Sequence, residues 1–282
     1  MITHNGTYLL HATHHGMPIY AATMGGKMVI GGWLLSATLQ AIVAAFGSAE
    51  GAEVIRKTND YLNRIATTDP QRALQLANFI NEDPMLVCSL VETSKMRWLV
   101  GDGKAYIDTE IIPDNTTFMY TKFKVLEIGN DYISCISYAD YSSGNRAFGI
   151  GSWDGKYFTN HGNYTFFNKT TTKGEIIEYT NNAGKSELKW EGGSESKTLS
   201  NVFTSPSSLI IGGISRNGSK NSSPSKGAAF NSYILKHQGI EKNFVPCYTE
   251  AYGSGMLDLN TLDFHPNANT EGSFTIAITD KA

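Results

Sequence analysis

From residue 96 onward, short apolar runs alternate with clusters of turn-forming residues, and this pattern constrains the fold more than any other feature of the sequence. Within many of the runs, apolar and polar residues alternate, as they do in strands that bury one face. The 28 glycines and the low share of charged residues, 17%, suit an all-β unit with many turns. We expect strands at 104–111, 117–127, 132–139, 146–152, 155–159, 163–167, 174–180, 184–191, 208–212, 228–237, 242–248, 255–259 and 273–279.

Short strands of this kind predict a mainly β fold in which two antiparallel sheets pack face to face as a β-sandwich of the jelly-roll type. Met119, Phe123 and Val125 lie an even number of residues apart, so we expect them to line one inner face. The segment 215–227 is rich in serine, asparagine and glycine, and we expect it to be a mobile loop.

The stretch 96–113 holds two apolar runs on either side of Gly101-Asp102-Gly103. Glycine tolerates a positive φ, so the chain can reverse tightly there. Pro113 lacks an N–H donor and marks the end of the second run. We therefore expect a β-hairpin that opens an antiparallel sheet.

The same stretch resembles a known family. Leu99-Val100-Gly101-Asp102-Gly103, followed by 105–109 and 112–113, resembles the opening of concanavalin A-like (laminin G-like) sandwich domains. The segments 244–247, 255–259, Phe264, 267–268 and 274–276 resemble the last strands of that family. Glu110 departs from the pattern, because a glycine often stands there in the family. The resemblance covers 91–282 and implies a concanavalin A-like sandwich in that part of the chain.

Domains of this family are common in structural proteins of tailed phages that infect gut bacteria. The resemblance therefore implies a virion structural protein, a head-fibre or tail-fibre subunit made in the host cytoplasm and bound to capsid or tail proteins. Residues 91–282 would display the sandwich, with a host surface glycan as a further partner, and residues 1–90 would attach or oligomerise the subunit. Two alternatives stay open: a glycoside hydrolase or lyase that degrades polysaccharide on the same fold, and a purely architectural decoration subunit.

The first part of the chain predicts short strands at 7–13, 17–22 and 27–30. Histidines 4, 11, 14 and 15 lie on and around the turn between the first two strands. Metal ligation needs converging donors, and no cysteine or carboxylate lies among them, so we expect no metal site. We expect no cofactor either.

Residues 28–46 carry no formal charge over the length of a membrane span. Gly31-Gly32, the polar residues Ser36, Thr38 and Gln40, and the lack of flanking Arg/Lys clusters argue against a span. We expect a buried helix over 33–46 that ends at Gly47. We also expect this helix to mediate homo-oligomerisation, with a trimer favoured, because one small domain cannot hide so much apolar surface. The predicted interface residues are Trp33, Leu35, Leu39 and Ile42.

Two further helices follow, at 49–65 with Ser48 as cap and from Pro70 to 83 with Asp69 as cap. Apolar residues at helical spacing define the face that each helix should bury. These residues are Val54, Ile55, Thr58, Leu62 and Ile65 in the first helix and Ala73, Leu74, Ala77 and Ile80 in the second. We place the boundary between the two regions at 90–91.

Composition excludes several classes of protein. A net charge of −3 without a basic patch argues against nucleic-acid binding. Cys88, Cys135 and Cys247 are widely spaced and odd in number, which indicates buried thiols rather than a disulfide framework or a metal site. The first residues include no basic segment, so we expect no cleaved secretion signal.

We expect no enzymatic activity, since the sequence has no nucleophile elbow, phosphate loop or His-Glu-x-x-His motif. A glycosidase would need a pair of carboxylates, and the candidates are Glu175, Glu178 and Glu187. Glu175 and Glu178 differ in strand parity, so one strand would place them on opposite faces.

Residues 152–164 combine aromatic side chains with Asp, Asn and Gly on two adjacent turns. Proteins hold sugars with aromatic faces and polar groups of these types. The predicted glycan-binding residues are Trp153, Asp154, Tyr157, Asn160 and His161. The alternative is that these aromatic residues pack across strands.

Overall fold

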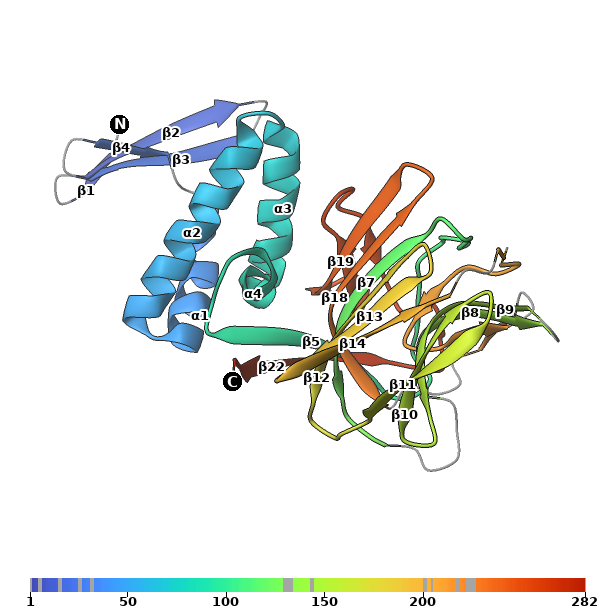
Figure 1. The fold of residues 1–282 in the computed structure, drawn as a ribbon. Coiled ribbons are helices and arrows are strands. Elements are labelled where there is room, and N and C mark those ends of the chain that lie inside the picture. The colour runs from blue at the N-terminus through green and yellow to red at the C-terminus, as the bar shows by residue number, and fades with distance from the viewer. Residues whose placement is uncertain are drawn as a thin grey trace. The chain divides into compact units, whose positions relative to one another are not determined.

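The computed structural model describes the chain except residues 1, 5–6, 15–16, 25–26, 31–32, 129–133, 143–144, 200–201, 204, 217–218, 222–226 and 282, and for 1–32, 129–147 and 214–221 it describes the backbone alone. The chain divides into two compact units (Figure 1). Met1–Lys95 with Lys281–Ala282 form the first unit, and Met96–Asp280 form the second.

The first unit begins with an antiparallel sheet in the order β1-β2-β3-β4. Its strands are β1 (Ile2–His4), β2 (Thr7–His14), β3 (Met17–Met24) and β4 (Lys27–Ile30). The three strands expected here are confirmed as β2, β3 and β4. The side chains of the four histidines lie outside the described residues, so the expectation of no metal at this turn is not tested there.

Helices follow the sheet: α1 (Ser36–Phe46), α2 (Ser48–Ala66), α3 (Pro70–Glu82), the 3₁₀ turn η1 (Pro84–Leu86) and α4 (Val87–Leu90). The uncharged run 28–46 is therefore split between the end of a strand and a helix of 11 residues that begins three positions later than expected. Among the described residues, no helix has the length and apolar character needed to cross a membrane.

The helix ends show how side chains fix this unit. Asp69 caps α3 as expected, because its carboxylate accepts a hydrogen bond from the backbone N–H of Arg72 at 2.9 Å. The expected cap of α2 is wrong: Gly47, with φ 80°, is the N-cap, and Ser48 is already helical. The cap of α1 comes from α3, where Asn81 Oδ1 accepts from the N–H of Leu35 and the hydroxyl of Thr38, both at 2.9 Å.

The buried faces of the helices follow the predicted spacing with small changes. Val54, Thr58 and Leu62 of α2 are buried, whereas Ile55 and Ile65 are only half-buried. In α3, Leu76 takes the buried position expected for Leu74. Gly51 allows α2 to approach α1 closely, since a Cβ at this position would lie 2.9 Å from the Cα of Val43.

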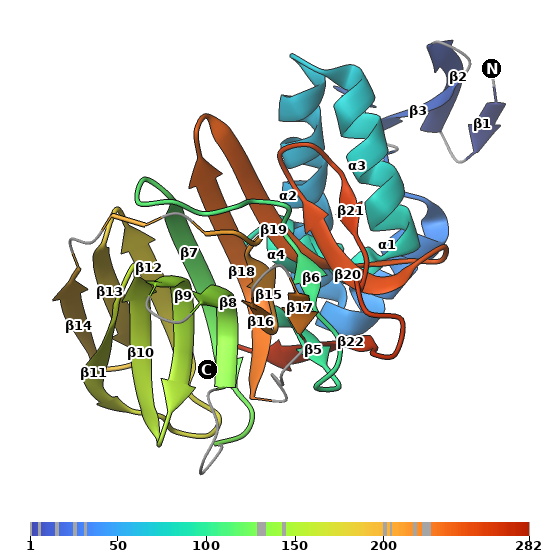
Figure 2. The same cartoon turned by 90° about the vertical axis from the view of Figure 1, so that its right-hand side faces the viewer.

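The second unit contains two sheets. The shorter sheet has the order β11-β10-β9-β8-β15-β6, with β16 and β17 attached at β8. Its strands are β6 (Ile107–Asp108), β8 (Ser134–Ser142), β9 (Asn145–Trp153), β10 (Lys156–His161), β11 (Tyr164–Thr170), β15 (Ile210–Ile211), β16 (Ile214–Arg216) and β17 (Ser219–Asn221). Figure 2 shows β8, β9 and β10 side by side, as their pairing requires.

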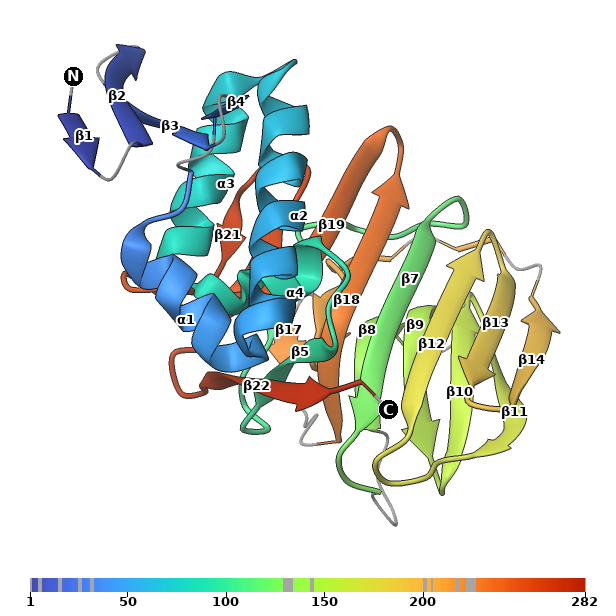
Figure 3. The ribbon, with the colours of Figure 1, turned by 90° about the vertical axis from the view of Figure 1, so that its left-hand side faces the viewer.

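The longer sheet has the order β14-β13-β12-β7-β18-β19-β20-β21, with β5 attached at β18 and β22 attached at β5. Its strands are β5 (Lys95–Gly101), β7 (Phe118–Val125), β12 (Ile176–Asn182), β13 (Lys185–Trp190), β14 (Gly193–Thr198), β18 (Ala228–His237), β19 (Ile240–Thr249), β20 (Gly253–Asp258), β21 (Phe264–His265) and β22 (Phe274–Asp280). In Figure 3 this sheet lies in front of β8, β9 and β10.

The core lies between the two sheets, which confirms the expected mainly β sandwich. Met119, Phe123 and Val125 are buried in it, as predicted. The ring of Phe123 meets that of Tyr157 across the sheets, edge to face, with 6.2 Å between centroids. The hydroxyl of Thr159 also crosses the gap and hydrogen-bonds the hydroxyl of Tyr179 at 2.7 Å. Apolar burial and paired polar groups therefore both hold the layers together.

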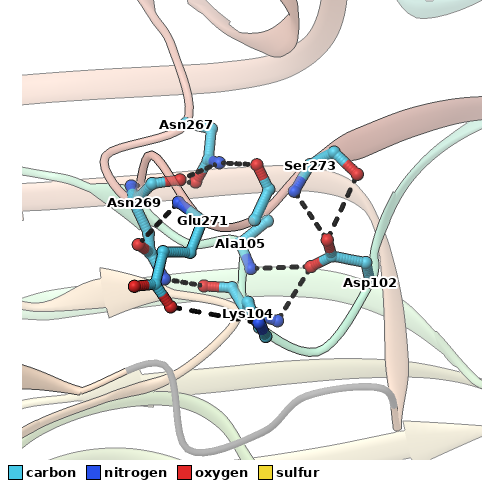
Figure 4. A network of polar contacts seen from close by, with 8 residues as sticks. Asp102, Lys104, Ala105, Asn267, Asn269, Glu271 and Ser273 are labelled. Carbon is cyan, nitrogen blue, oxygen red and sulfur yellow. Dashed lines mark hydrogen bonds and ion pairs between the residues drawn. The ribbon is translucent and has the colours of Figure 1, made fainter.

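The hairpin expected over 96–113 is wrong. β5 pairs with β18 and β22 in the longer sheet, whereas β6 pairs with β15 in the shorter one. The turn at Asp102 therefore carries the chain from one sheet to the other. The Asp102 carboxylate accepts hydrogen bonds from the N–H groups of Lys104 and Ala105 and from the N–H and hydroxyl of Ser273 (Figure 4).

Other differences concern the extent and number of the strands. The expected strand 104–111 shrinks to β6, and the polar edge strand β14 was not expected. The loop expected over 215–227 contains part of β16 and all of β17, which pair with each other. Glu110, where the family often has glycine, has a φ of 61°. This left-handed conformation explains why glycine suits that position.

Candidate functional site

The five residues predicted to bind glycan do not share one surface. Tyr157, Asn160 and His161 belong to β10 and are 0%, 1% and 2% exposed, so they cannot contact a glycan. Trp153 is 41% exposed, and Asp154 is exposed beside it. The prediction is therefore wrong for the three β10 residues, because this strand is covered on both faces.

The buried residues of β10 help to build the core. Tyr157 packs against Phe123, and burial, with Glu175 adding to it, raises the pKa of the Tyr157 hydroxyl well above its usual value. The His161 ring stands edge-on to Phe203, with 5.0 Å between centroids. Burial lowers the pKa of His161, an effect that Asp114 only partly opposes. Both side chains are therefore neutral members of the core at pH 7.

The turn between β9 and β10 places Trp153 at the surface. Asp154 and Gly155 have φ values of 50° and 70°, and positive φ at both central residues is typical of a type I′ turn. Trp153 and Lys156 flank these two residues and are paired directly across the hairpin. Their side chains therefore lie on the same face of the shorter sheet, with Cβ atoms about 5 Å apart.

Trp153 is the exposed end of a row of four aromatic side chains, which we call the aromatic row. Its ring lies against Phe166 of β11, with 6.1 Å between centroids and a tilt of 47°. Phe158 and Tyr164 both stand edge-on to Phe166, at 6.2 and 5.5 Å. Phe158 is buried, whereas Phe166 and Tyr164 are half-buried.

Strand alternation places the aromatic row on the side of the sheet that faces away from the core. Phe158 follows the core residue Tyr157, and Phe166 precedes the core residue Phe167, so each points to the opposite face. Phe158 lies directly between Gly151 of β9 and Phe166 of β11 in the strand register. Gly151 has no side chain to cover this part of the row.

The chemical character of the aromatic row suits a ligand with both apolar and polar faces. Aromatic rings supply flat apolar contact area at low conformational cost. Asp154 and Lys156, both exposed, add an acceptor and a donor next to Trp153. Such a combination can stack against the C–H face of a sugar ring and hydrogen-bond its hydroxyl groups.

Sequence reasoning missed Lys156 and three members of the aromatic row, Phe158, Tyr164 and Phe166. The signal for Tyr164 and Phe166 was the period-two spacing that places both on one face of β11. The pairing of β11 with Phe158, which only the register shows, completes the row.

No family model matches this sequence. No curated protein matches it either. Two of the solved structures that resemble the chain are a Bacteroides ovatus protein provisionally described as carbohydrate-binding and a mutant Trypanosoma rangeli sialidase with trans-sialidase activity.

The B. ovatus protein is 11% identical, with a TM-score of 0.48, and the match covers 67% of this chain and 61% of that protein. The sialidase is 8% identical, with a TM-score of 0.32, and the match covers 83% of this chain and 41% of the sialidase. The chain thus spans less than two thirds of the length of either protein.

The three carboxylates that are candidates for hydrolysis are held by different lysines. Glu175 forms an ion pair with Lys169. Glu178 and Glu187 form ion pairs of 3.1 Å with Lys122 and Lys189. Each of these carboxylates thus has a lysine partner of its own.

In the described part of the chain, no group of three or more His, Cys, Asp or Glu side chains is placed to hold an ion. Asp102 illustrates the reason, since N–H and O–H donors occupy both of its oxygens. A cation would need those oxygen lone pairs. Cys88 and Cys247 are not in a disulfide, and the side chain of Cys135 lies outside the described residues.

The first unit has a shallow groove of about 760 Å³. The side chains around it carry mixed charge and come from α2 and its C-cap, and from the end of α4 and the segment after it. They are Lys57, Asp60, Asn63, Arg64, Thr67, Leu90, Val91 and Glu92.

The residues predicted to form the oligomer interface differ in their exposure. Ile42 is 0% exposed and packed inside its own unit, so it cannot contact another subunit without unfolding. Leu35 is 56% exposed and Leu39 is half-buried. The indole N–H of Trp33 donates to Asn63 Oδ1 at 2.9 Å, which fixes its ring against α2. Leu35 is therefore the best-exposed member of the predicted set.

Proposed function

We propose that the sandwich binds carbohydrate through the aromatic row. The observation that carries this proposal is the 41% exposure of Trp153 at the end of a packed aromatic cluster on the outer face of the sheet. A large exposed aromatic side chain braced by neighbours loses little conformational entropy when a ligand stacks on it. The polar groups of Asp154 and Lys156 lie within reach of the substituents of such a ligand.

We propose binding without hydrolysis. Glycosidases place two carboxylic groups on either side of one glycosidic bond, with one of them protonated. Glu175, Glu178 and Glu187 each form an ion pair with a different lysine instead. A polysaccharide-degrading enzyme on the same fold is the alternative, and an assay for released reducing ends on the glycan that the protein binds separates the two.

We further propose that the protein is a virion structural subunit of a tailed phage, of head-fibre or tail-fibre type. The resemblance of 99–113 and 244–276 to phage sandwich domains supports this proposal. In it, residues 1–90 attach the subunit to capsid or tail proteins and assemble it as a trimer. The uncharged helix α1 and the exposed Leu35 favour such contacts between subunits. Electron microscopy of phage particles that carry a label on this protein tests its position on the virion. Particles without any label would contradict the proposal.

The binding proposal is tested with the full-length protein on an array of bacterial surface glycans. Trp153→Ala should weaken binding to a recognised glycan about tenfold or more, because one stacked aromatic contact contributes on the order of 1–2 kcal/mol. Tyr164→Ala should weaken it less, since Tyr164 is half-buried. Tyr252→Ala is the matched control, because Tyr252 is an exposed tyrosine on the hairpin between β19 and β20.

Two outcomes would contradict the binding proposal. One is a parent protein that binds no glycan on the array, which would favour an architectural decoration subunit. The other is a Trp153→Ala variant that keeps full affinity while folding normally by circular dichroism, which would place the binding surface elsewhere.

A further inference from the structure

Lys156 is an exposed cation placed directly beside Trp153. The two residues are a register pair across the β9–β10 hairpin and share a face of the sheet. Many lysines of the sandwich have a carboxylate partner, among them Lys169, Lys189 and Lys197. Among the described residues, Lys156 forms no ion pair. Its ammonium group is therefore available to a ligand that stacks on Trp153.

Lys156 is the cation that the strand register pairs directly with Trp153. Glu195 accepts hydrogen bonds from the N–H groups of Asn168 and Lys169 and pairs with Lys197 at 2.9 Å, so its charge is already compensated. Asp154 is exposed in the turn and can accept hydrogen bonds from hydroxyl groups. The surface thus presents an acceptor, Asp154, and a cation, Lys156, next to the indole ring of Trp153.

We propose that the ligand of the aromatic row is an anionic glycan, in which a sugar ring stacks on Trp153 while its carboxylate pairs with Lys156. This inference rests on the proposed glycan binding and names the class of sugar. The C–H groups of the sugar ring face the indole, and the sugar hydroxyls reach Asp154. The ammonium group of Lys156 pairs with the sugar carboxylate. Lys156 then acts as a specificity determinant, because a neutral sugar gains nothing from its charge.

The chain contains a matched control for Lys156. The hairpin between β12 and β13 has the same turn, with Ala183 and Gly184 at φ values of 48° and 87°. Lys185 occupies the position of Lys156 in that hairpin, and it is also exposed and without a described ion pair. Its register partner is Asn182, however, and not a tryptophan. Lys185→Met therefore removes the same charge from the same turn position away from the aromatic row.

The experiment measures the affinity of the full-length protein for two matched pairs of probes. One pair is an oligogalacturonate and its methyl ester, in which small methyl groups replace the carboxylate charges. The other is sialyllactose and lactose. In at least one pair, the acidic probe should bind about two- to fivefold more tightly, the range expected for an exposed ion pair. The preference should shrink between about 0.01 M and about 1 M salt, because ions screen exposed charges.

Lys156→Met should remove the preference for the acidic probe, and Lys185→Met should keep it. Equal affinity for both members of each pair, or a preference that survives Lys156→Met, would overturn the inference. A protein that binds none of the four probes, but binds a neutral glycan on the array through Trp153, would also overturn the inference. In that case the proposed glycan binding would stand. A protein that binds no glycan at all would overturn both the inference and the proposed function.

Discussion

The carboxylate of Asp102 accepts hydrogen bonds from the backbone N–H of Ser273 at 2.8 Å and from its hydroxyl at 3.2 Å, across 171 positions of the sequence. The backbone N–H of Asp102 in turn donates to the carbonyl of Ser273. Asn269 adds a hydrogen bond from its side chain to the carbonyl of Lys104, as Figure 4 shows. These contacts between Asp102, Lys104, Asn269 and Ser273, which we call the clasp, hold the beginning of the sandwich against its last strand.

Asp102→Asn should destabilise the protein by about 1–3 kcal/mol, because the amide would present a donor to N–H groups that need an acceptor. The pH dependence gives a second readout. Burial would raise the pKa of Asp102, but hydrogen bonds from Lys104, Ala105 and Ser273 outweigh it and hold the pKa below its usual value of 3.8. The clasp therefore contributes its stability above about pH 4 and loses it as the pH falls through the folded-state pKa.

Urea titrations between about pH 2 and pH 7 should show that the parent loses this contribution in acid and that Asp102→Asn lacks it throughout. Asp154→Asn is the control, because Asp154 is exposed and has no described hydrogen bond. An Asp102→Asn variant with the same acid dependence as the parent would refute the role assigned to the carboxylate.

Gly272→Ala should destabilise the same clasp by about 1–3 kcal/mol. A Cβ at residue 272 would lie 2.5 Å from the backbone nitrogen of Ala105 and 2.6 Å from the carbonyl carbon of Lys104. Since both neighbours are backbone atoms, they can move away only if the turn shifts. Thermal unfolding of Gly272→Ala, of Asp102→Asn and of the double variant checks this, and additive losses would show that the two residues act independently.

The strands with strong alternation could be predicted from the sequence. Residues 228–237 were expected as a strand and form β18, and 117–127 contains β7. The pairing partners could not be predicted, because apolar residues on either side of a glycine turn look the same in a hairpin and in a crossing between two sheets. The clasp of Asp102 with Ser273, which sequence separation hides, marks the difference.

The candidate site was predicted only in part for a related reason. Trp153 and Asp154 were found because a turn signal marks the surface, but the strand expected over 155–159 extends to His161 as β10 and is buried on both faces. The outer face of β10 is covered by aromatic residues of β11, so Phe158 and Asn160 lose exposure that alternation alone would assign to them. Register, rather than composition, decides which aromatic side chains meet.

Tyr157→Ala should act on stability and not specifically on glycan binding. Tyr157 is fully buried, and truncating a side chain of this size in a core costs about 3–5 kcal/mol. Tyr157→Phe should be neutral or stabilising, because the buried hydroxyl has no hydrogen-bond partner among the described residues. Chemical unfolding of both variants measures the change in the free energy of unfolding. A Tyr157→Phe variant as unstable as Tyr157→Ala would show that the hydroxyl has a structural partner.

Asn81→Ala should weaken the start of α1. Its side chain accepts hydrogen bonds from Leu35 and Thr38 and donates one to the carbonyl of Trp33. Loss of a helix cap costs about 0.5–2 kcal/mol. Asn78→Ala, an exposed position on the same helix, provides the control in thermal melts followed at a helical wavelength. Equal melting of the two variants would mean that α1 does not depend on this cap.

Leu35→Asp should abolish the proposed homo-oligomer without unfolding its subunit. Leu35 is 56% exposed and occupies the N-cap position of α1, where aspartate is among the favoured residues. The substitution therefore suits the helix while it places a charge on the apolar surface proposed to meet other subunits. In a three-fold assembly the charge is repeated in every subunit, so its cost is multiplied around the axis.

Light scattering of the full-length protein in detergent-free buffer measures this outcome. The parent should have the mass of a trimer and Leu35→Asp that of a monomer, with unchanged circular dichroism. Val202→Asp is the matched control, because Val202 is a highly exposed apolar residue of the other unit and its replacement should leave the assembly intact. A monomeric parent would exclude the oligomer. A Leu35→Asp variant that stays trimeric would show that other residues of the first unit form the contact. The reason is that an acidic group buried at a three-fold interface has no partner to offset its desolvation.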